Sequence, residues 1–185
     1  MPEILSIGHS TRTSEDFVAR LGEASVELLV DVRRYPGSRR VPWTHAGELG
    51  ALLAEKSIGY VHLAALGGRR RPAKPSANGG WTNSQFQGYA DHLTSAEFAG
   101  GLAVLETEAR RRRAAVMCAE AQWWRCHRRI LADVLVARGW RVLHLDLRGG
   151  SKEHELTPFA VVSDFQVAYP ASDVRTGVPP TQMTV

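Results

Sequence analysis

The chain has 185 residues, of which 44% are hydrophobic, and this is enough for one substantial core. Two cysteines give no disulfide framework, no apolar segment is long enough to span a membrane, and residues 1–10 do not resemble a signal peptide, so we expect a cytoplasmic protein. The net charge of +4 rests on 20 arginines against three lysines, a bias that suits phosphate or carboxylate recognition but is also typical of a GC-rich genome.

Strands and helices are predicted to alternate along the chain. Apolar runs predict strands at residues 4–7, 28–32, 60–63, 114–117 and 141–145. Helical patterns occur near residues 14–23, 46–56, 84–92, 97–112 and 124–138. The alternation is typical of an α/β domain, a mainly parallel sheet flanked by helices in three layers. We expect this single domain over residues 1–168, with a long loop at 67–80 and a C-terminal tail over 169–185.

Polar side chains follow the predicted strands at the edge where open parallel sheets bind ligands. The residues concerned are His9, Ser10 and Arg12 after the first strand, Asp31, Arg33 and Arg39 at the second, Gly67 and Gly68 after the third, Cys118 to His127 after the fourth, and His144 and His154 at and after the fifth. Each one has an ordinary structural role available, such as capping a turn or anchoring a loop. Their convergence at one edge is the stronger signal, and we expect His9, Asp31, Arg33, Cys118 and His127 to surround one cavity.

Cys118 directly follows the fourth predicted strand and is expected in the turn that leads to the next predicted helix. The N–H groups and dipole at a helix start lower the pKa of a thiol, so Cys118 is the predicted nucleophile, with an inert buried thiol as the alternative. Glu120 and His127 are candidate proton-transfer residues. Glu120 equally suits a first-turn carboxylate, and His127, on the buried face of the helical wheel, equally suits a structural histidine.

Cys126 lies about two helical turns beyond Cys118 in this interpretation, where the dipole effect has faded. The two cysteines could form a peroxidatic and resolving pair, although their spacing does not require one. Cys118 and Arg125 are separated by six residues, which fits a phosphatase loop poorly. A metal site made of both cysteines and a histidine is the least favoured alternative because paired CxxC ligands are absent, and we expect no metal and no other cofactor.

Six motifs occur in order: IGHSTR (7–12), LVDVRRYPGSRR (29–40), GYVHLAALGGRR (59–70), FQGYADHL (86–93), MCAEAQWWRCHRR (117–129) and HELTPFA (154–160). They resemble the motifs of the bacterial and archaeal family named domain of unknown function 488. The resemblance covers about residues 3–162 and implies a compact α/β domain, but it supplies no reaction.

The resemblance also implies a shared site. Its residues would be His9, Ser10, Arg12, Asp31, Arg33, Pro36, Arg39, Gly67, Gly68, Tyr89, Cys118, Glu120, Cys126, His127, Arg128 and His154. Relatives often carry a short polar turn ending in proline where this chain has Ala121-Gln122-Trp123-Trp124, so the loop shape and the substrate are expected to differ here.

The favoured function is a cysteine-dependent enzyme acting on an anionic, nucleotide-like substrate at the carboxyl-end edge of the sheet. Its catalytic residues would be Cys118, Glu120 and His127, and its substrate-binding residues His9, Ser10, Arg12, Asp31, Arg33, Arg39, Arg125 and His154. The alternative is a nucleotide or nucleic-acid binding module in which Trp81 or Trp123 stacks on bases. The expected partner is therefore an anionic small molecule, a nucleotide or a nucleic acid, with no membrane contact; the oligomeric state is left open.

Overall fold

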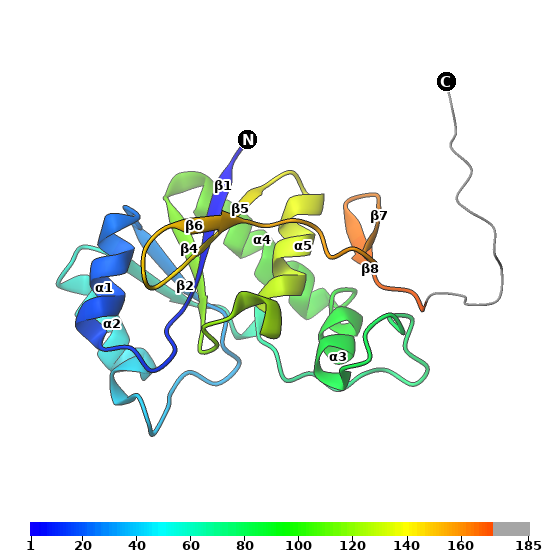
Figure 1. The fold of residues 1–185 in the computed structure, drawn as a ribbon, viewed down its shortest axis with the longest axis horizontal. Helices are drawn as coiled ribbons and strands as arrows, with labels where there is room; N and C mark the ends of the chain where they lie inside the picture. Colours follow the sequence, from blue (N-terminus) through cyan, green and yellow to red (C-terminus); the bar gives the residue numbers. More distant parts are fainter. Residues whose placement is uncertain (172–185) are drawn as a thin grey trace.

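The computed structural model describes residues 1–171, and the rest of the predicted tail lies outside the described residues (Figure 1). The first half contains β1 (Glu3–Gly8), α1 (Ser14–Glu23), β2 (Leu28–Asp31), α2 (Ala46–Ala54) and β3 (Gly59–His62), with 3₁₀ turns at Pro42–Thr44 and Ala64–Leu66. The second half contains α3 (Ser84–His92), α4 (Ala96–Arg111), β4 (Ala114–Cys118), a 3₁₀ turn at Trp123–Arg125, α5 (Arg128–Ala137), β5 (Arg141–Leu145), β6 (Ser151–Glu153), β7 (Val161–Ser163) and β8 (Gln166–Ala168).

The six-stranded sheet has the order β3-β2-β4-β1-β5-β6. Its first five strands are parallel, and β6 joins β5 in the antiparallel sense. Helices cover both faces, as Figure 1 shows, with α1 and α2 on one side and α3, α4 and α5 on the other. The predicted three-layer α/β architecture is confirmed. No helix among residues 1–171 is long and apolar enough to cross a membrane.

Alternating side chains of the central strands supply both halves of the core. In β1, Leu5 and Ile7 pack with the α1 side chains Phe17 and Leu21, whereas Ile4 faces the cluster formed with α3, α4 and α5. All four residues of β2 and all five of β4 are buried. Because such strands are covered on both faces, they appear in the sequence as continuous apolar runs, and this made them recognisable.

The element boundaries agree closely with the sequence analysis at α1, α3 and β5, and one helix differs. The helix expected near residues 124–138 begins only at Arg128, because residues 119–122 form a loop and Trp123–Arg125 a separate 3₁₀ turn. The strands β6, β7 and β8 were not predicted. All residues of β6 and β7 are exposed, and Val167 is the one buried residue of β8, so these short strands lack a buried apolar run. Tyr169, where the tail was expected to begin, is fully buried in the core.

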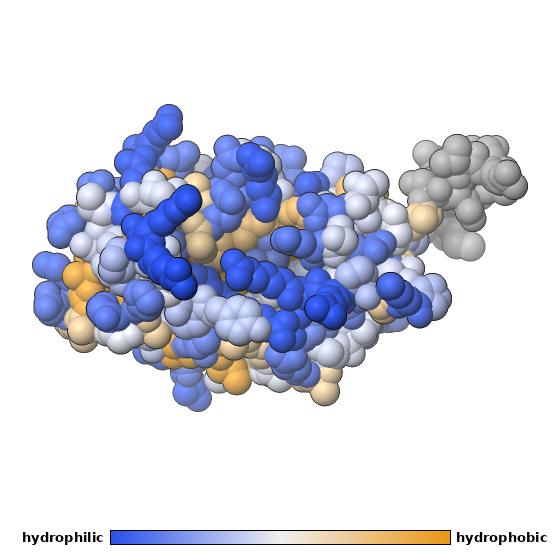
Figure 2. Space-filling view, turned by 90° about the horizontal axis from the view of Figure 1, so that it is seen from below, coloured by the Kyte–Doolittle hydropathy of each residue, from blue (hydrophilic) through white to orange (hydrophobic). Residues whose placement is uncertain are grey.

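The parallel register brings the carboxyl ends of β1, β2 and β4 together. Gly8 pairs with Cys118, and Asp31 pairs with Met117, so the last residues of three central strands lie side by side. This edge lies at the bottom of Figure 1, and Figure 2 views the molecule from that side. It is the edge at which the sequence predicted a site.

Candidate functional site

A cavity of about 330 Å³ opens at the carboxyl ends of β2 and β4. Its walls come from four parts of the chain: the loop after β2, the loop after β3, the start of α3, and the segment between β4 and α5. The lining residues are Arg33, Arg34, Tyr35, Gly37, Gly68, Arg69, Asn83, Gln85, Phe86, Cys118, Ala119, Glu120, Arg125, Cys126 and His127. Residues that are scattered through the sequence therefore share one hollow.

Both cysteines lie at the base of this cavity and touch each other. Cys118 is the last residue of β4, Cys126 precedes α5, and their sulfur atoms are 2.8 Å apart as free thiols. Only 3% of Cys118 and 7% of Cys126 is exposed to solvent. The loop and 3₁₀ turn between β4 and α5 reverse the direction of the chain. This reversal brings Cys118 and Cys126 together, whereas a continuous helix would separate them.

Arg128, in the first turn of α5, is buried beneath the two thiols. Its Nε donates to Cys118 Sγ at 3.0 Å, Nη1 donates to Ser6 Oγ at 3.1 Å, and Nη2 donates to the carbonyl of Glu120. No carboxylate among residues 1–171 pairs with this guanidinium, which is 2% exposed. Because a buried cation without a counter-charge is costly, the adjacent sulfurs are the groups best placed to supply one.

The surroundings of the two thiols shift their pKa values in opposite directions. Burial by itself would raise the pKa of Cys126, but the hydrogen bond from Cys118 and the charge of Arg128 outweigh it and lower this pKa to about 6. Burial and the hydrogen bond to Cys126 raise the pKa of Cys118 well above its ordinary value. Neutral pH therefore favours a Cys126 thiolate that accepts the Cys118 S–H.

His127 stands beside the Cys126 sulfur with its ring fixed from the other side. Its Nε2 lies 3.1 Å from the carbonyl oxygen of Val32, and its Nδ1 lies 3.4 Å from Cys126 Sγ. A carbonyl only accepts hydrogen bonds, so Nε2 must carry the proton, and the neutral ring then turns a bare Nδ1 toward the thiol. Burial lowers the pKa of His127, which favours this neutral form.

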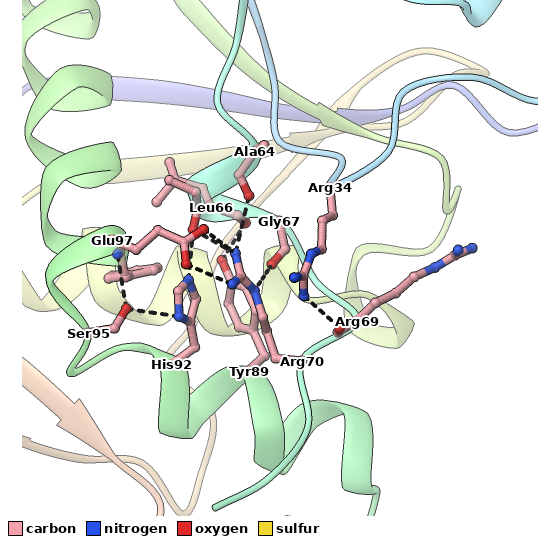
Figure 3. Close-up of polar contacts among 12 residues, drawn as sticks. Arg34, Ala64, Leu66, Gly67, Arg69, Arg70, Tyr89, His92, Ser95 and Glu97 are labelled. Carbon is pink, nitrogen blue, oxygen red and sulfur yellow. Dashed lines mark hydrogen bonds and ion pairs between the residues drawn. The ribbon is translucent and has the colours of Figure 1, made fainter.

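The loop after β3 forms one wall of the cavity, and polar contacts that involve α3 and α4 hold it in place (Figure 3). Arg70 donates to the carbonyls of Ala64 and Gly67 and pairs with Glu97 of α4 at 2.9 Å. The Tyr89 hydroxyl donates to the Leu66 carbonyl at 2.8 Å. These contacts fix the position of Gly67-Gly68 from two neighbouring helices.

Both glycines of this loop allow close approaches that a larger residue would prevent. A β-carbon on Gly67 would lie 2.7 Å from the backbone of Arg34, and one on Gly68 would lie 2.9 Å from His127 Nδ1. Gly68 thus lets the imidazole ring reach the cysteines. This is the structural reason for the two glycines that the sequence places after β3.

Arg33 is fixed by Asp31 at the end of β2. The guanidinium donates to the Asp31 carboxylate through Nε and Nη2, the latter at 2.6 Å, and Tyr60 donates to the same carboxylate at 2.8 Å. His9 Nε2 lies 3.4 Å from Arg33 Nη1. Burial, with the nearby Arg33 charge, lowers the pKa of His9 to about 4, so His9 is neutral at physiological pH.

The rim of the cavity is cationic. Arg34, Arg69 and Arg125 line it, and none of the three pairs with a carboxylate in the described part of the chain; Glu120 is the one acidic side chain in the lining. Arg34 donates to the Arg69 carbonyl at 3.2 Å, and Figure 3 shows the Arg69 side chain extending away from its loop. In Figure 2, strongly hydrophilic side chains extend across this edge of the molecule. The arrangement favours an anion.

The structure brings together part of the expected site. Of the five residues expected around one cavity, Arg33, Cys118 and His127 line it, whereas Asp31 and His9 lie behind Arg33 and hold it. Glu120 and Arg125 also line it. The expectation that Cys118 opens a helix is wrong: a loop and a 3₁₀ turn come first, and α5 begins at Arg128, two residues after Cys126.

The remaining predicted residues lie elsewhere. Ser10 and Arg12 line a second hollow of about 660 Å³, on the other side of the segment 121–124. Arg39 is exposed and lines neither hollow. His154 is buried in a chain of hydrogen bonds, 2.9 Å from His144 Nε2 on one side and 2.9 Å from Asp133 Oδ1 on the other.

The two tryptophans considered for base stacking are engaged within the protein. Trp81 packs in an aromatic cluster with Phe86, Phe159 and Tyr169. Trp123 stacks on His144 with ring centroids 4.0 Å apart and nearly parallel planes. Trp124 is 48% exposed and lines the second hollow, so it is the tryptophan with a free surface.

Several lining residues escaped the sequence analysis. Asn83, Gln85 and Phe86 lie at the start of α3, which follows a long loop and not a strand, so they are not among the polar residues that follow strands. Arg34 and Arg69 stand next to residues that were selected, but an arginine-rich chain gives them no distinguishing signal. No group of three or more His, Cys, Asp or Glu side chains within residues 1–171 is placed to hold a metal ion.

Comparison with known families gives one result. The family model described as Domain of unknown function DUF488 matches residues 13–135, which is more than half of the chain. The matched range contains β2 to β4 and most of α5, and therefore both cysteines, His127 and Arg128. No curated protein and no solved structure matched the chain.

Proposed function

The chain belongs to the family of domain of unknown function DUF488, and we propose that it is a thiol-dependent enzyme that acts on a small anionic substrate at the carboxyl-end edge of its sheet. The observation that carries this proposal is the buried Arg128, whose guanidinium contacts Cys118 Sγ and has no carboxylate partner in the described residues. A thiolate on the cysteine pair supplies the missing negative charge.

Cys126 is the proposed nucleophile, in place of the Cys118 favoured from the sequence. It lies two residues before α5, where helix N–H groups stabilise a thiolate, and its sulfur is within hydrogen-bond distance of Cys118 Sγ. Its neighbour His127 presents Nδ1 at 3.4 Å and is oriented by the Val32 carbonyl. When Cys126 is protonated, the bare Nδ1 is an adjacent acceptor for its proton, so His127 would serve as the base that returns Cys126 to the thiolate.

The unpaired arginines select the substrate. Arg34, Arg69 and Arg125 at the rim would hold a carboxylate or phosphate, while the electrophilic atom reaches Cys126 below. Arg33 contributes less to this binding, because Asp31 already neutralises it. Glu120 lines the same cavity without a side-chain contact to either sulfur, and we propose it as a proton-transfer residue for the bound substrate.

Alkylation with a charged and a neutral reagent tests this function. Iodoacetate and iodoacetamide both alkylate thiolates. The rate of each reagent at Cys126 is divided by its rate with a small uncharged reference thiol, and the ratio of the two normalised rates reports the attraction of the anion alone. We expect iodoacetate to be favoured about tenfold or more at low salt, with the preference falling as salt screens the arginines.

Matched arginine variants complete the test. Arg69→Gln and Arg125→Gln should each reduce the iodoacetate preference. Arg111→Gln should not, because Arg111 is exposed at the end of α4, next to the start of β4 and so at the opposite edge of the sheet. Equal normalised rates for the two reagents, or alkylation of Cys126 only above about pH 8.5 as in a free thiol, would overturn the proposal.

A further inference from the structure

The two cysteines are more closely associated than a single-nucleophile enzyme needs. Cys126 alone would serve as a nucleophile, yet a second buried thiol lies 2.8 Å from its sulfur, inside the same cavity wall. Cys118 is held there from two further sides, by Gly8 across the sheet and by Arg128 Nε at 3.0 Å. Cys118 is therefore expected to have a chemical role of its own.

We propose that Cys118 and Cys126 form a two-electron dithiol–disulfide couple that reduces a disulfide bond in an anionic small molecule, with Cys126 as the attacking and Cys118 as the resolving cysteine. This inference rests on the proposed thiolate function and names its substrate class.

In the first step the Cys126 thiolate attacks one sulfur of the substrate disulfide. A bond forms between Cys126 Sγ and that sulfur, the substrate S–S bond breaks, and the other half leaves as a thiolate. In the second step Cys118 attacks Cys126 Sγ, the mixed disulfide breaks, and the departing sulfur takes the Cys118 proton. The protein pair loses two electrons and becomes a disulfide. The substrate is reduced to one thiolate, released in the first step, and one thiol, which carries the Cys118 proton.

Arg128 provides the physical means of passing reactivity from one cysteine to the other. In the proposed resting site Cys126 is the thiolate, and the Cys118 proton lies between the two sulfurs, which are 2.8 Å apart. Once Cys126 is bound covalently, it is neutral and no longer stabilises the Cys118 proton. The guanidinium, 3.0 Å from Cys118 Sγ, then has no counter-charge except a Cys118 thiolate.

The surroundings of the pair suit a disulfide with charged halves. The cavity of about 330 Å³ is too large for a small peroxide to fill, and its unpaired arginines match carboxylates on either side of a sulfur–sulfur bond. Arg34 and Arg69 come from the adjoining loops after β2 and β3, and Arg125 comes from the segment between β4 and α5, so two anionic groups could be held at once.

The test uses 5,5′-dithiobis(2-nitrobenzoate), a disulfide with a carboxylate on each half, together with the neutral 4,4′-dithiodipyridine. The reduced full-length protein is reacted with each reagent at neutral pH. The released product is measured by its absorbance, and the mass of the protein is determined by mass spectrometry. We expect two thiolates per chain from the wild type and an internal disulfide without an adduct. The anionic reagent should react faster than the neutral one after correction for their intrinsic rates.

Single variants assign the two roles. Cys118→Ser, which keeps a hydrogen-bond donor near Cys126, should release one thiolate and retain one adduct on Cys126. Cys126→Ser should react slowly or not at all in the folded state. If these variants fail to fold, the mass of the wild-type product still decides, because an internal disulfide and an adduct differ in mass.

The failures of the two proposals are distinguishable. A wild-type protein that reacts rapidly at Cys126 but keeps one or two adducts overturns the couple and leaves the nucleophile standing. An intermolecular disulfide also overturns it. A wild-type protein in which neither cysteine reacts at neutral pH, while the denatured chain does, overturns both the couple and the thiolate function.

Discussion

Gly68 lies so close to the ring of His127 that a β-carbon on it would stand 2.9 Å from Nδ1 and 3.1 Å from Cγ. The loop after β3 therefore shapes the thiol site without contacting either sulfur through a side chain of its own. Because Arg70 and Tyr89 hold this loop in place, the loop has little freedom to retreat.

The variant Gly68→Ala is expected to displace the His127 ring and slow the reaction of Cys126 severalfold, while the protein still folds. The backbone at Gly68 is not in the left-handed region, so alanine brings no backbone strain of its own. Gly47→Ala is the control, since a β-carbon at Gly47 meets no atom within 4 Å. The measurement is the alkylation rate of Cys126 at fixed pH, and equal rates in the two variants would contradict the positioning role.

The reactivity of Cys126 should depend on the hydrogen bond from Cys118. In the wild type the alkylation rate should fall as the pH is lowered through about 6, the pKa at which Cys126 takes up its proton. Cys118→Ser keeps a donor and should leave this midpoint near its wild-type value. Cys118→Ala removes the donor and should raise the midpoint toward the free-thiol value of about 8.5. Midpoints that coincide in the two variants would show that the hydrogen bond does not matter.

Arg128→Met removes the buried cation and should raise the pKa of Cys126. The midpoint of the alkylation profile is expected to move upward by about one unit or more, because the thiolate loses its charge partner. The free energy of unfolding should fall by about 1–3 kcal/mol, since Ser6 and the Glu120 carbonyl lose a buried donor. Arg125→Met serves as the exposed control and should change the midpoint little. An unchanged profile in Arg128→Met would remove the main support for the thiolate.

Asp31→Asn should destabilise the fold. It leaves the guanidinium of Arg33, 6% exposed, without its counter-charge, and removal of one partner from a buried ion pair costs about 3–5 kcal/mol. Glu97→Gln breaks the more exposed pair with Arg70 and should cost less than about 1 kcal/mol. Urea unfolding of both variants measures the two values. Comparable losses would mean that Asp31 is not the anchor of the β2 edge.

Sulfate or phosphate should stabilise the native protein by binding at the cationic rim. Ligands that bind only the folded state raise the unfolding temperature, and the rise grows with their concentration. We expect a larger shift with sulfate than with chloride at matched ionic strength, and a smaller difference in Arg69→Gln. Identical unfolding temperatures in the two salts would count against an anion site in this cavity.

The sequence by itself determined the layered architecture and the edge at which the site lies. Apolar runs such as 28–32 and 114–117 are typical of buried strands, and the helical spacing between them favours crossovers of the kind that make strands parallel. Once the strands are parallel, the residues after them meet at one edge. That inference needed only the local pattern, and it brought Arg33 and Cys118 into one site.

Only the tertiary structure decided which thiol lies near the start of α5. The sequence pattern placed the helix start near Trp124, whereas in the structure Trp123–Arg125 form a separate 3₁₀ turn, Trp123 stacks on His144, and α5 begins at Arg128. The helix start then falls beside Cys126 and not Cys118. The sequence also does not indicate that Arg128 is buried without a carboxylate partner, because its burial and its contacts depend on the residues that β1 and the 119–122 loop place next to it. A pKa is a property of all neighbours in space, and sequence spacing reports only those along the chain.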